Sequence, residues 1–131
     1  ALLTTRGLRD VWHIGSQARP QLFDLEIKCP ENLYDHVIEV DERVLLANDD
    51  LMKRPTLQPQ NLHDAITGEK MYVEKPLDAD QIRKILQELQ EKGIKSIAVV
   101  FMHAALYPEH EKLVGQIAKE MGCFRQVSLS H

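Results

Sequence analysis

The sequence has few cysteines and no long apolar run, which disfavours several classes of protein. Its 131 residues contain two cysteines, Cys29 and Cys123, far apart and outside any CxxC pair, so neither a disulfide framework nor a zinc knuckle is expected. No apolar run reaches the ~18 residues that a membrane helix needs. The N-terminus lacks the basic region and the apolar core that are typical of a signal peptide. We therefore expect a cytoplasmic protein with reduced thiols.

The chain also lacks a concentration of positive charge. Its formal net charge is -4, and its lysines and arginines are scattered along the sequence. Nucleic acid and anionic membranes attract basic faces or polybasic segments, so neither is an expected partner. A hydrophobic fraction of 44% and a charged fraction of 27% are ordinary for a globular protein. We expect residues 1–131 to form a single α/β domain.

Motifs that identify common enzyme classes are absent as well. The sequence contains no P-loop, no GxGxxG fingerprint, no GxSxG nucleophile elbow and no HExxH zinc motif. Neither cysteine lies in a recognisable nucleophile signature. Composition and spacing alone therefore indicate an α/β domain without specifying its chemistry.

The N-terminal half predicts a short helix followed by strands. Apolar residues recur at helical spacing behind Thr4 and Thr5, either of which can cap a helix over residues 6–15. Alternation of apolar and polar residues predicts three short strands, at residues 22–27, 37–40 and 44–46. Residues 48–68 have two prolines and no periodicity, so we expect a long loop there, either an insertion or a functional flap.

Helix and strand signals are stronger after this loop. Residues 71–74 predict a strand that pairs antiparallel with residues 43–47. Asp78 and Gln81 form a capping-box pattern before a helix with an apolar stripe. Gly93 follows this stripe and is expected to end the helix in a left-handed conformation.

A βαβ unit is predicted at the end of the sequence. Residues 97–102 form a continuous apolar run, which is typical of a central strand buried on both faces. Pro108 is expected to be the first residue of a helix that ends before Gly122, and residues 126–130 form the last strand. Strand, helix and strand at this spacing predict a right-handed crossover between parallel strands. The expected fold is α/β with one mixed sheet.

His103 is the leading candidate for a catalytic residue. It directly follows the buried strand, and ligands of open α/β sheets bind at the carboxyl ends of strands. An imidazole there can act as a general acid or base, or orient a polar substrate group. The alternative is a histidine that hydrogen-bonds the backbone of the neighbouring loop.

Three arginines flank the first predicted helix: Arg6, Arg9 and Arg19. Guanidinium groups bind phosphate and carboxylate in a bidentate manner, so these side chains would form a substrate-binding or phosphate-binding pocket if they converge. The alternative is a set of scattered surface arginines, with Arg9 paired to a nearby carboxylate.

The acidic motif Asp41-Glu42-Arg43 places three charges between apolar strands. It is either a tight turn with an internal ion pair or a group of side chains directed into a cleft. A two-histidine, one-carboxylate metal site would need His103, His110 and Glu111. Their spacing supports such a site poorly, so we expect no metal, and a solvated helix start at His110 and Glu111 is the simpler interpretation.

Several segments of the chain form a recognisable series. They are TTRGLRDV at residues 4–11, IGSQARP and LFDL within 14–25, VDERV at 40–44, TGE and KPL within 67–77, MH and PEHE within 102–111, and VSLSH at 127–131. In this order they resemble the hydantoinase A/5-oxoprolinase family over nearly the whole chain. Residues 33–44 most resemble its single-chain eukaryotic members.

The resemblance implies that the chain is a fragment from the N-terminal half of a larger enzyme, with an actin/sugar-kinase-like ATPase core. The implied reaction is ATP-dependent opening of 5-oxo-L-proline to L-glutamate by a homodimeric full-length enzyme that uses ATP and Mg²⁺. His103 and the three arginines would then contribute to the reaction. The isolated chain, which has apolar residues at both ends, is expected to be inactive and to bind no cofactor.

Three positions depart from the family pattern, and at the first of them Leu8 replaces the usual Phe, which is a tolerable apolar exchange. Ala104 and Tyr107 stand where the family has Ser and Asn. Loss of the asparagine at the expected N-cap weakens the helix start by ~1 kcal/mol, and loss of the hydroxyl argues against a strict hydrogen-bonding role for His103. Two alternatives remain: a structural or subunit-contact module without a ligand, and part of a related hydantoin-cleaving or acetone-carboxylating enzyme.

Overall fold

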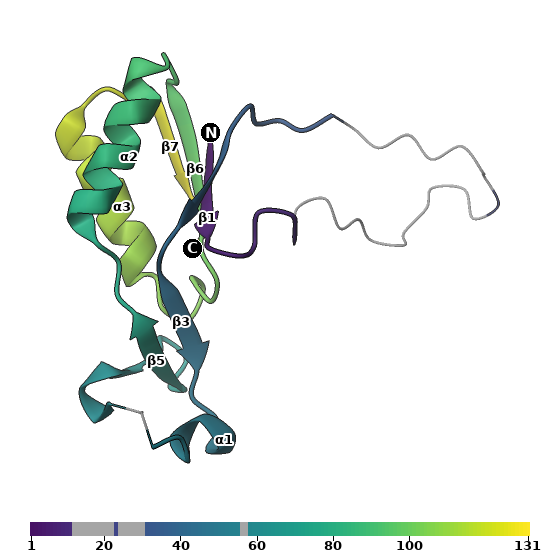
Figure 1. The fold of residues 1–131 in the computed structure, drawn as a ribbon, viewed down its shortest axis with the longest axis vertical. Helices are drawn as coiled ribbons and strands as arrows, with labels where there is room; N and C mark the ends of the chain where they lie inside the picture. The colour runs from purple at the N-terminus through teal and green to yellow at the C-terminus, as the bar shows by residue number, and fades with distance from the viewer. Residues whose placement is uncertain (12–22, 24–30, 56–57) are drawn as a thin grey trace.

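The computed structural model describes residues 1–11, 23, 31–55 and 58–131. This part of the chain forms two sheets, the larger of which is covered by helices on one side (Figure 1). The larger sheet has the strand order β2-β1-β6-β7, and its pairings are all parallel. Its strands are β1 (Leu2–Thr5), β2 (Val37–Val40), β6 (Ser96–Val100) and β7 (Gln126–Leu129).

The start of the chain differs from its prediction. Leu2–Thr5 is a fully buried strand that pairs with both β2 and β6, so its two threonines cap no helix. The described beginning of the predicted helix 6–15 consists of turns. Here the amide of Arg6 donates to the carbonyl of Val40 at 2.9 Å, and Gly7 has a φ of +89°. Residues 12–15 and, apart from Phe23, the predicted strand at 22–27 lie outside the described residues.

The helix α2 (Ala79–Glu91) is confirmed, including its predicted signals at both ends. The carboxylate of Asp78 accepts hydrogen bonds from the amides of Asp80 at 2.9 Å and Gln81 at 3.2 Å. Gly93 has a φ of +75°, which a glycine adopts without steric cost. The apolar stripe faces the sheet through Ile82, Leu86 and Leu89.

The helix α3 (Glu109–Met121) joins β6 to β7 and completes the predicted βαβ unit with parallel strands. The helix begins one residue later than predicted, because Pro108 occupies the N-cap position, where no side chain makes a capping hydrogen bond. Tyr107 therefore lies outside the cap. Gly122 ends the helix with a φ of +63°.

The main core lies between the parallel sheet and the two helices α2 and α3, which cover the same face (Figure 1). β6 contributes Ile97 and Val99 to this face, whereas Ala98 and Val100 on the opposite face are half-buried. The central position of β6 is confirmed. Its burial on the helix side is complete, and its burial on the opposite side is partial within this chain.

A smaller antiparallel sheet has the order β3-β5-β4. Its strands are β3 (Arg43–Leu46), β4 (Leu62–Asp64) and β5 (Lys70–Lys75). The predicted pairing of residues 71–74 with 43–47 is confirmed, but parallel and antiparallel pairing occur in two separate sheets rather than in one mixed sheet.

The predicted loop at 48–68 contains elements of its own. Besides β4 it includes a one-turn helix, α1 (Asp49–Met52), and a 3₁₀ turn, η2 (Pro59–Asn61). The side chain of Asn48 caps α1 by accepting from the amide of Leu51 at 2.8 Å. Elements this short have no periodicity that the sequence could reveal.

The small sheet lies beyond the carboxyl ends of the parallel strands (Figure 1). Its core residues Val44, Ala65, Met71 and Val73 pack with Leu106 and Tyr107, which belong to the connection between β6 and α3. That connection therefore lies against both sheets. In the described part of the chain, no helix is long and apolar enough to cross a membrane.

Candidate functional site

The carboxyl ends of the four parallel strands meet at one edge of the larger sheet. From β1 the sheet extends to β2 on one side and to β6 and β7 on the other. The chain therefore changes direction in the sheet between β1 and β6, and ligands of open α/β sheets bind at such a switch point. The segments that reach it are the end of β1, the residues after β2 and β6, and the first turn of α3.

A buried polar cluster lies at this switch point. Its members are Thr5 at the end of β1, Glu42 after β2 and His110 in the first turn of α3, which are 0%, 1% and 7% exposed. One carboxylate oxygen of Glu42 accepts from the hydroxyl of Thr5, and the other lies 2.7 Å from Nδ1 of His110. The amide of Met102 donates to the Thr5 hydroxyl at 2.9 Å.

These contacts determine the donors and acceptors in the cluster. Because the Thr5 oxygen accepts from a backbone amide, its own proton points to Glu42. Glu42 as a carboxylate can only accept, so Nδ1 of His110 carries a proton and donates it. In the neutral ring, Nε2 then has the free lone pair and can accept a proton from another molecule.

Two aromatic rings extend this cluster toward the small sheet. The ring of Tyr107 meets that of His110 edge-on, with centroids 5.5 Å apart, and lies 5.4 Å from that of His63 in β4. Burial of the phenol, and secondarily the negative charge of Glu109, raise the pKa of Tyr107. The phenol of Tyr107 is therefore uncharged at physiological pH and places an aromatic ring beside His110.

Glu111 forms a second buried cluster, and its side chain is 0% exposed. Its carboxylate accepts from the amides of Phe101 at 2.8 Å and Ser130 at 2.7 Å, and from the Ser130 hydroxyl at 2.6 Å. Nδ1 of His131 lies 3.0 Å from it. Glu111 thus ties α3 to the ends of β6 and β7. The predicted solvated helix start is wrong for both His110 and Glu111, because the strand ends and the connection after β6 cover the first turn of α3.

His103 follows β6, as predicted, and adopts a left-handed backbone conformation with a φ of +62°. Its carbonyl accepts from the amides of Leu106 and Tyr107, both at 2.9 Å, and so closes the turn before α3. Its imidazole makes no hydrogen bond within the described residues. A positive φ in a residue other than glycine stores strain, and such residues cluster at functional sites.

The predicted arginine candidates lie on the surface after β1. Arg6 is 3.6 Å from Asp41 and Arg9 is 3.9 Å from Asp10, with side chains 69% and 58% exposed. Arg19 lies outside the described residues. The anion pocket stays a prediction.

The three charges of the 41–43 motif point to different partners. Asp41 pairs with Lys75 of β5 and with Arg6, Glu42 is buried in the polar cluster, and Nη2 of Arg43 donates to the carbonyl of Arg6 at 2.7 Å. The hydrogen bond from Lys75, aided by the charges of Lys75 and Arg6, lowers the pKa of Asp41. The motif therefore joins the two sheets, while Glu42 contributes to the switch point.

The described residues offer no group of three or more His, Cys, Asp or Glu side chains able to hold a metal ion. His110 and Glu111 point to different partners, which separates the expected ligands of a two-histidine, one-carboxylate site. The first turn of α3 is also a poor phosphate site, because it carries the carboxylates of Glu109 and Glu111.

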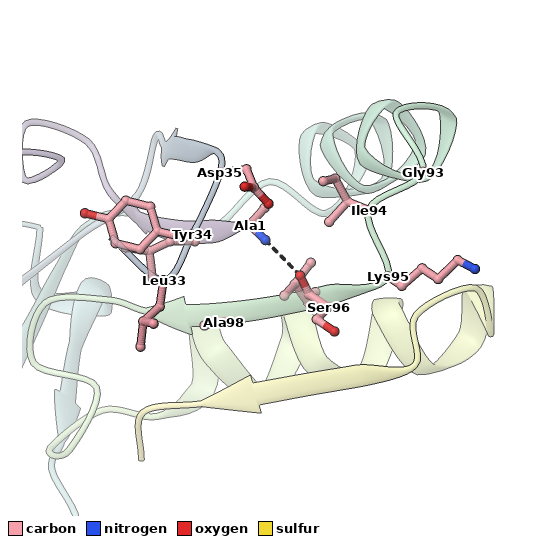
Figure 2. A pocket seen from close by; sticks show the side chains of 11 residues that line it. Ala1, Leu33, Tyr34, Asp35, Gly93, Ile94, Lys95, Ser96 and Ala98 are labelled. Carbon is pink, nitrogen blue, oxygen red and sulfur yellow. Dashed lines mark hydrogen bonds between the residues drawn. The ribbon is translucent and has the colours of Figure 1, made fainter. Parts of the chain in front are cut away.

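A hollow of about 550 Å³ lies at the opposite end of the sheet, beside the amino ends of β1 and β6 (Figure 2). Leu33, Tyr34 and Ile94 contribute to its wall, and the amino group of Ala1 donates to the carbonyl of Ser96 at 2.8 Å. Burial lowers the pKa of this amino group. The hollow has neither a buried carboxylate nor a histidine, so the switch point is the stronger candidate for chemistry.

Thr5 and the pairing of Glu42 with His110 could not be identified from the sequence. The two partners are 68 residues apart, and no periodicity connects them. The family resemblance is the sequence signal that could have indicated them, because Glu42 belongs to the VDERV motif and His110 to the PEHE motif.

Comparison with known proteins relates the chain to enzymes with one shared name. Over 130 residues it is 47% identical to 5-oxoprolinase 1 of Arabidopsis thaliana, and over 132 residues it is 45% identical to a 5-oxoprolinase of Dictyostelium discoideum. A 5-oxoprolinase of Saccharomyces cerevisiae is 44% identical over 136 residues. Each alignment covers 99% of this chain but 10% of the relative, so the chain spans about a tenth of their length.

A family model describes the same region. The model of the hydantoinase/oxoprolinase N-terminal region matches residues 1–122. This range includes Thr5, Glu42 and His110 but not β7 or the residues after it. The chain therefore belongs to the hydantoinase/oxoprolinase N-terminal region family.

Proposed function

We propose that this chain is a segment of an ATP-dependent 5-oxoprolinase and that its switch point forms part of the active site. The identity of 44 to 47% with three proteins named 5-oxoprolinase, over 99% of the chain, carries this proposal. The reaction converts 5-oxo-L-proline, ATP and water into L-glutamate, ADP and phosphate. An unstrained lactam is a poor electrophile, so phosphorylation of its oxygen by ATP would create the leaving group that hydrolysis requires.

The nucleotide and Mg²⁺ are assigned to parts of the enzyme beyond the described residues. The described residues have no carboxylate cluster for a divalent ion and an acidic helix start where a phosphate would otherwise bind. We assign the described switch point to the lactam side of the reaction instead. We further propose an actin/sugar-kinase-like ATPase core, a cytoplasmic location and a homodimer for the full-length enzyme. The parallel sheet is compatible with such a core.

The isolated chain is proposed to be inactive because it spans about a tenth of its relatives. Calorimetry of the 131-residue chain with MgATP and 5-oxoproline tests this part, and turnover by the chain would overturn it. A structural module without ligand contact is the rival function. The hydrogen bonds of Glu111 favour it for that side chain, since they join three elements of the fold.

Substitutions in the full-length enzyme separate the two functions. His103→Ala is expected to lower kcat/KM for 5-oxoproline by about 100-fold if the strained turn contacts substrate, and Arg9→Ala is expected to raise KM. Arg83→Ala, on the exposed side of α2, is the matched control and should stay within about twofold. Wild-type rates in both test variants would leave the structural function. Turnover of hydantoin or acetone in place of 5-oxoproline would assign the chain to a related enzyme.

A further inference from the structure

We propose that His110 accepts a proton from the nucleophile at the switch point and that Glu42 is the positioning residue that holds its ring. This inference rests on the proposed function, because it assigns the dyad to the hydrolytic step of lactam opening. It is independent of His103, which reaches the same edge of the sheet from the turn after β6.

Burial of the Glu42 carboxylate has a cost in free energy that its contacts must offset. A carboxylate that is removed from water loses several kcal/mol of solvation unless hydrogen bonds and an opposite charge replace it. Within the described residues its side-chain partners are Thr5 and His110, and its side chain is 0% exposed. Both oxygens are thus used to fix one neutral hydroxyl and one imidazole. This arrangement gives the ring a defined position and tautomer.

The contact with Glu42 also determines the state of Nε2, the other ring nitrogen of His110. Nδ1–H donates a hydrogen bond to Glu42, so in the neutral ring Nε2 is the acceptor, and no hydrogen bond within the described residues occupies it. The side chain of His110 retains 9% exposure, so the ring is not completely enclosed. A carboxylate that orients an imidazole in this way also stabilises the imidazolium formed on proton uptake.

The surroundings of the His110 ring also favour a role as a base. Titratable groups face it from two sides: Glu42 from the segment after β2, and Tyr107 from the residues before α3. His63 of β4 lies on the far side of Tyr107. Because Tyr107 is neutral at physiological pH, Glu42 is the charged group that contacts His110 in the part of the chain that the structure describes. Within the described residues the ring therefore has one fixed carboxylate partner, which is the arrangement that orients a general base.

The proposed step is the addition of water to the activated lactam. A water oxygen forms a bond to the activated lactam carbon while the π pair of the carbon–nitrogen bond moves onto the ring nitrogen. The water O–H bond breaks, its electron pair stays on oxygen, and its proton passes to Nε2 of His110. Glu42 remains a carboxylate throughout and donates no proton.

The test uses the full-length enzyme and a substitution that keeps the structural contact. In His110→Asn, the side-chain amide can still donate to Glu42 from near the position of Nδ1, but Nε2 is removed. We expect kcat to fall by about 100-fold to 10,000-fold with KM nearly unchanged. Glu42→Gln should lower kcat by about 10-fold to 100-fold. Glu120→Gln, at the other end of α3, is the control.

Chemical rescue by imidazole distinguishes a proton-accepting role of His110 from a purely structural one. Added imidazole should restore part of the activity of His110→Ala, because it can replace the missing acceptor, and should not affect His103→Ala. A His110→Asn enzyme that retains its melting temperature and wild-type kcat would overturn the proposal. A wild-type enzyme with no ATP cleavage in the presence of 5-oxoproline would instead overturn the proposed function, so the two failures are distinct.

Discussion

Glu111 allows the sharpest test of how this fold is held together. The Glu111→Ala substitution removes an acceptor that is fully buried and satisfies the amides of Phe101 and Ser130 and the Ser130 hydroxyl. A buried donor that loses its partner costs about 1 to 3 kcal/mol. Phe101 is 5% exposed, so its amide bears this cost in full, whereas Ser130 lies closer to solvent and can bind water.

We therefore expect the free energy of unfolding to fall by about 3 to 5 kcal/mol in Glu111→Ala, a value in the range for breaking a buried charged network. Glu111→Gln keeps one acceptor oxygen and should lose about half as much. Urea denaturation of the 131-residue chain, followed by circular dichroism, measures both values. The matched control is Glu109→Gln, whose carboxylate is 57% exposed and pairs with Lys112, with an expected change below about 0.5 kcal/mol.

The relative size of the two changes decides the outcome. A loss below about 1 kcal/mol in Glu111→Ala would show that water replaces the carboxylate and that the ends of β6 and β7 do not depend on it. A loss in Glu109→Gln as large as that in Glu111→Gln would show that charge near the helix start matters rather than the buried contacts.

Three further substitutions test the ion pair between the sheets and the helix ends. Asp41→Asn should lower the free energy of unfolding at neutral pH, because the Lys75 contact lowers the folded-state pKa of Asp41. The difference from wild type should vanish as the pH falls through that folded-state pKa. A difference that persists at acid pH would refute the ion pair. Asp78→Ala should lower the free energy of unfolding by ~1 kcal/mol by removing the α2 cap, measured by urea denaturation; no change would contradict the capping contact. Gly122→Ala should cost about 1 kcal/mol in the same measurement, since Gly122 has a φ of +63°, and an unchanged stability would contradict the left-handed helix end.

The elements predicted correctly are those with several local signals. α2 has a capping residue, an apolar stripe and a terminal glycine within one segment, and each of these acts through neighbours along the chain. β1 has none of these signals. It is four residues long and buried on both faces, so it shows no alternation, and its two threonines are also typical helix caps.

The sequence predicted that His103 follows a buried strand, but it did not indicate the buried cluster of Thr5, Glu42 and His110. The position of His103 followed from the rule that sites lie at the carboxyl ends of strands, and the turn after β6 does reach this edge. The burial of Glu42 and His110 depends on contacts between segments far apart in the chain. Charged residues in a first helical turn are usually solvated, and only the three-dimensional arrangement shows that this turn is covered.

The small antiparallel sheet begins and ends on neighbouring strands. Arg43 at its entry is paired with Lys75 at its exit, so the chain enters the small sheet after β2 and leaves it before α2 at nearly the same point. The length of the segment between Arg43 and Lys75 therefore does not affect the spacing of the parallel strands. We therefore expect a change in the length of this segment to leave the parallel sheet intact, provided that the apolar surface of Leu106 and Tyr107 beneath the small sheet remains covered.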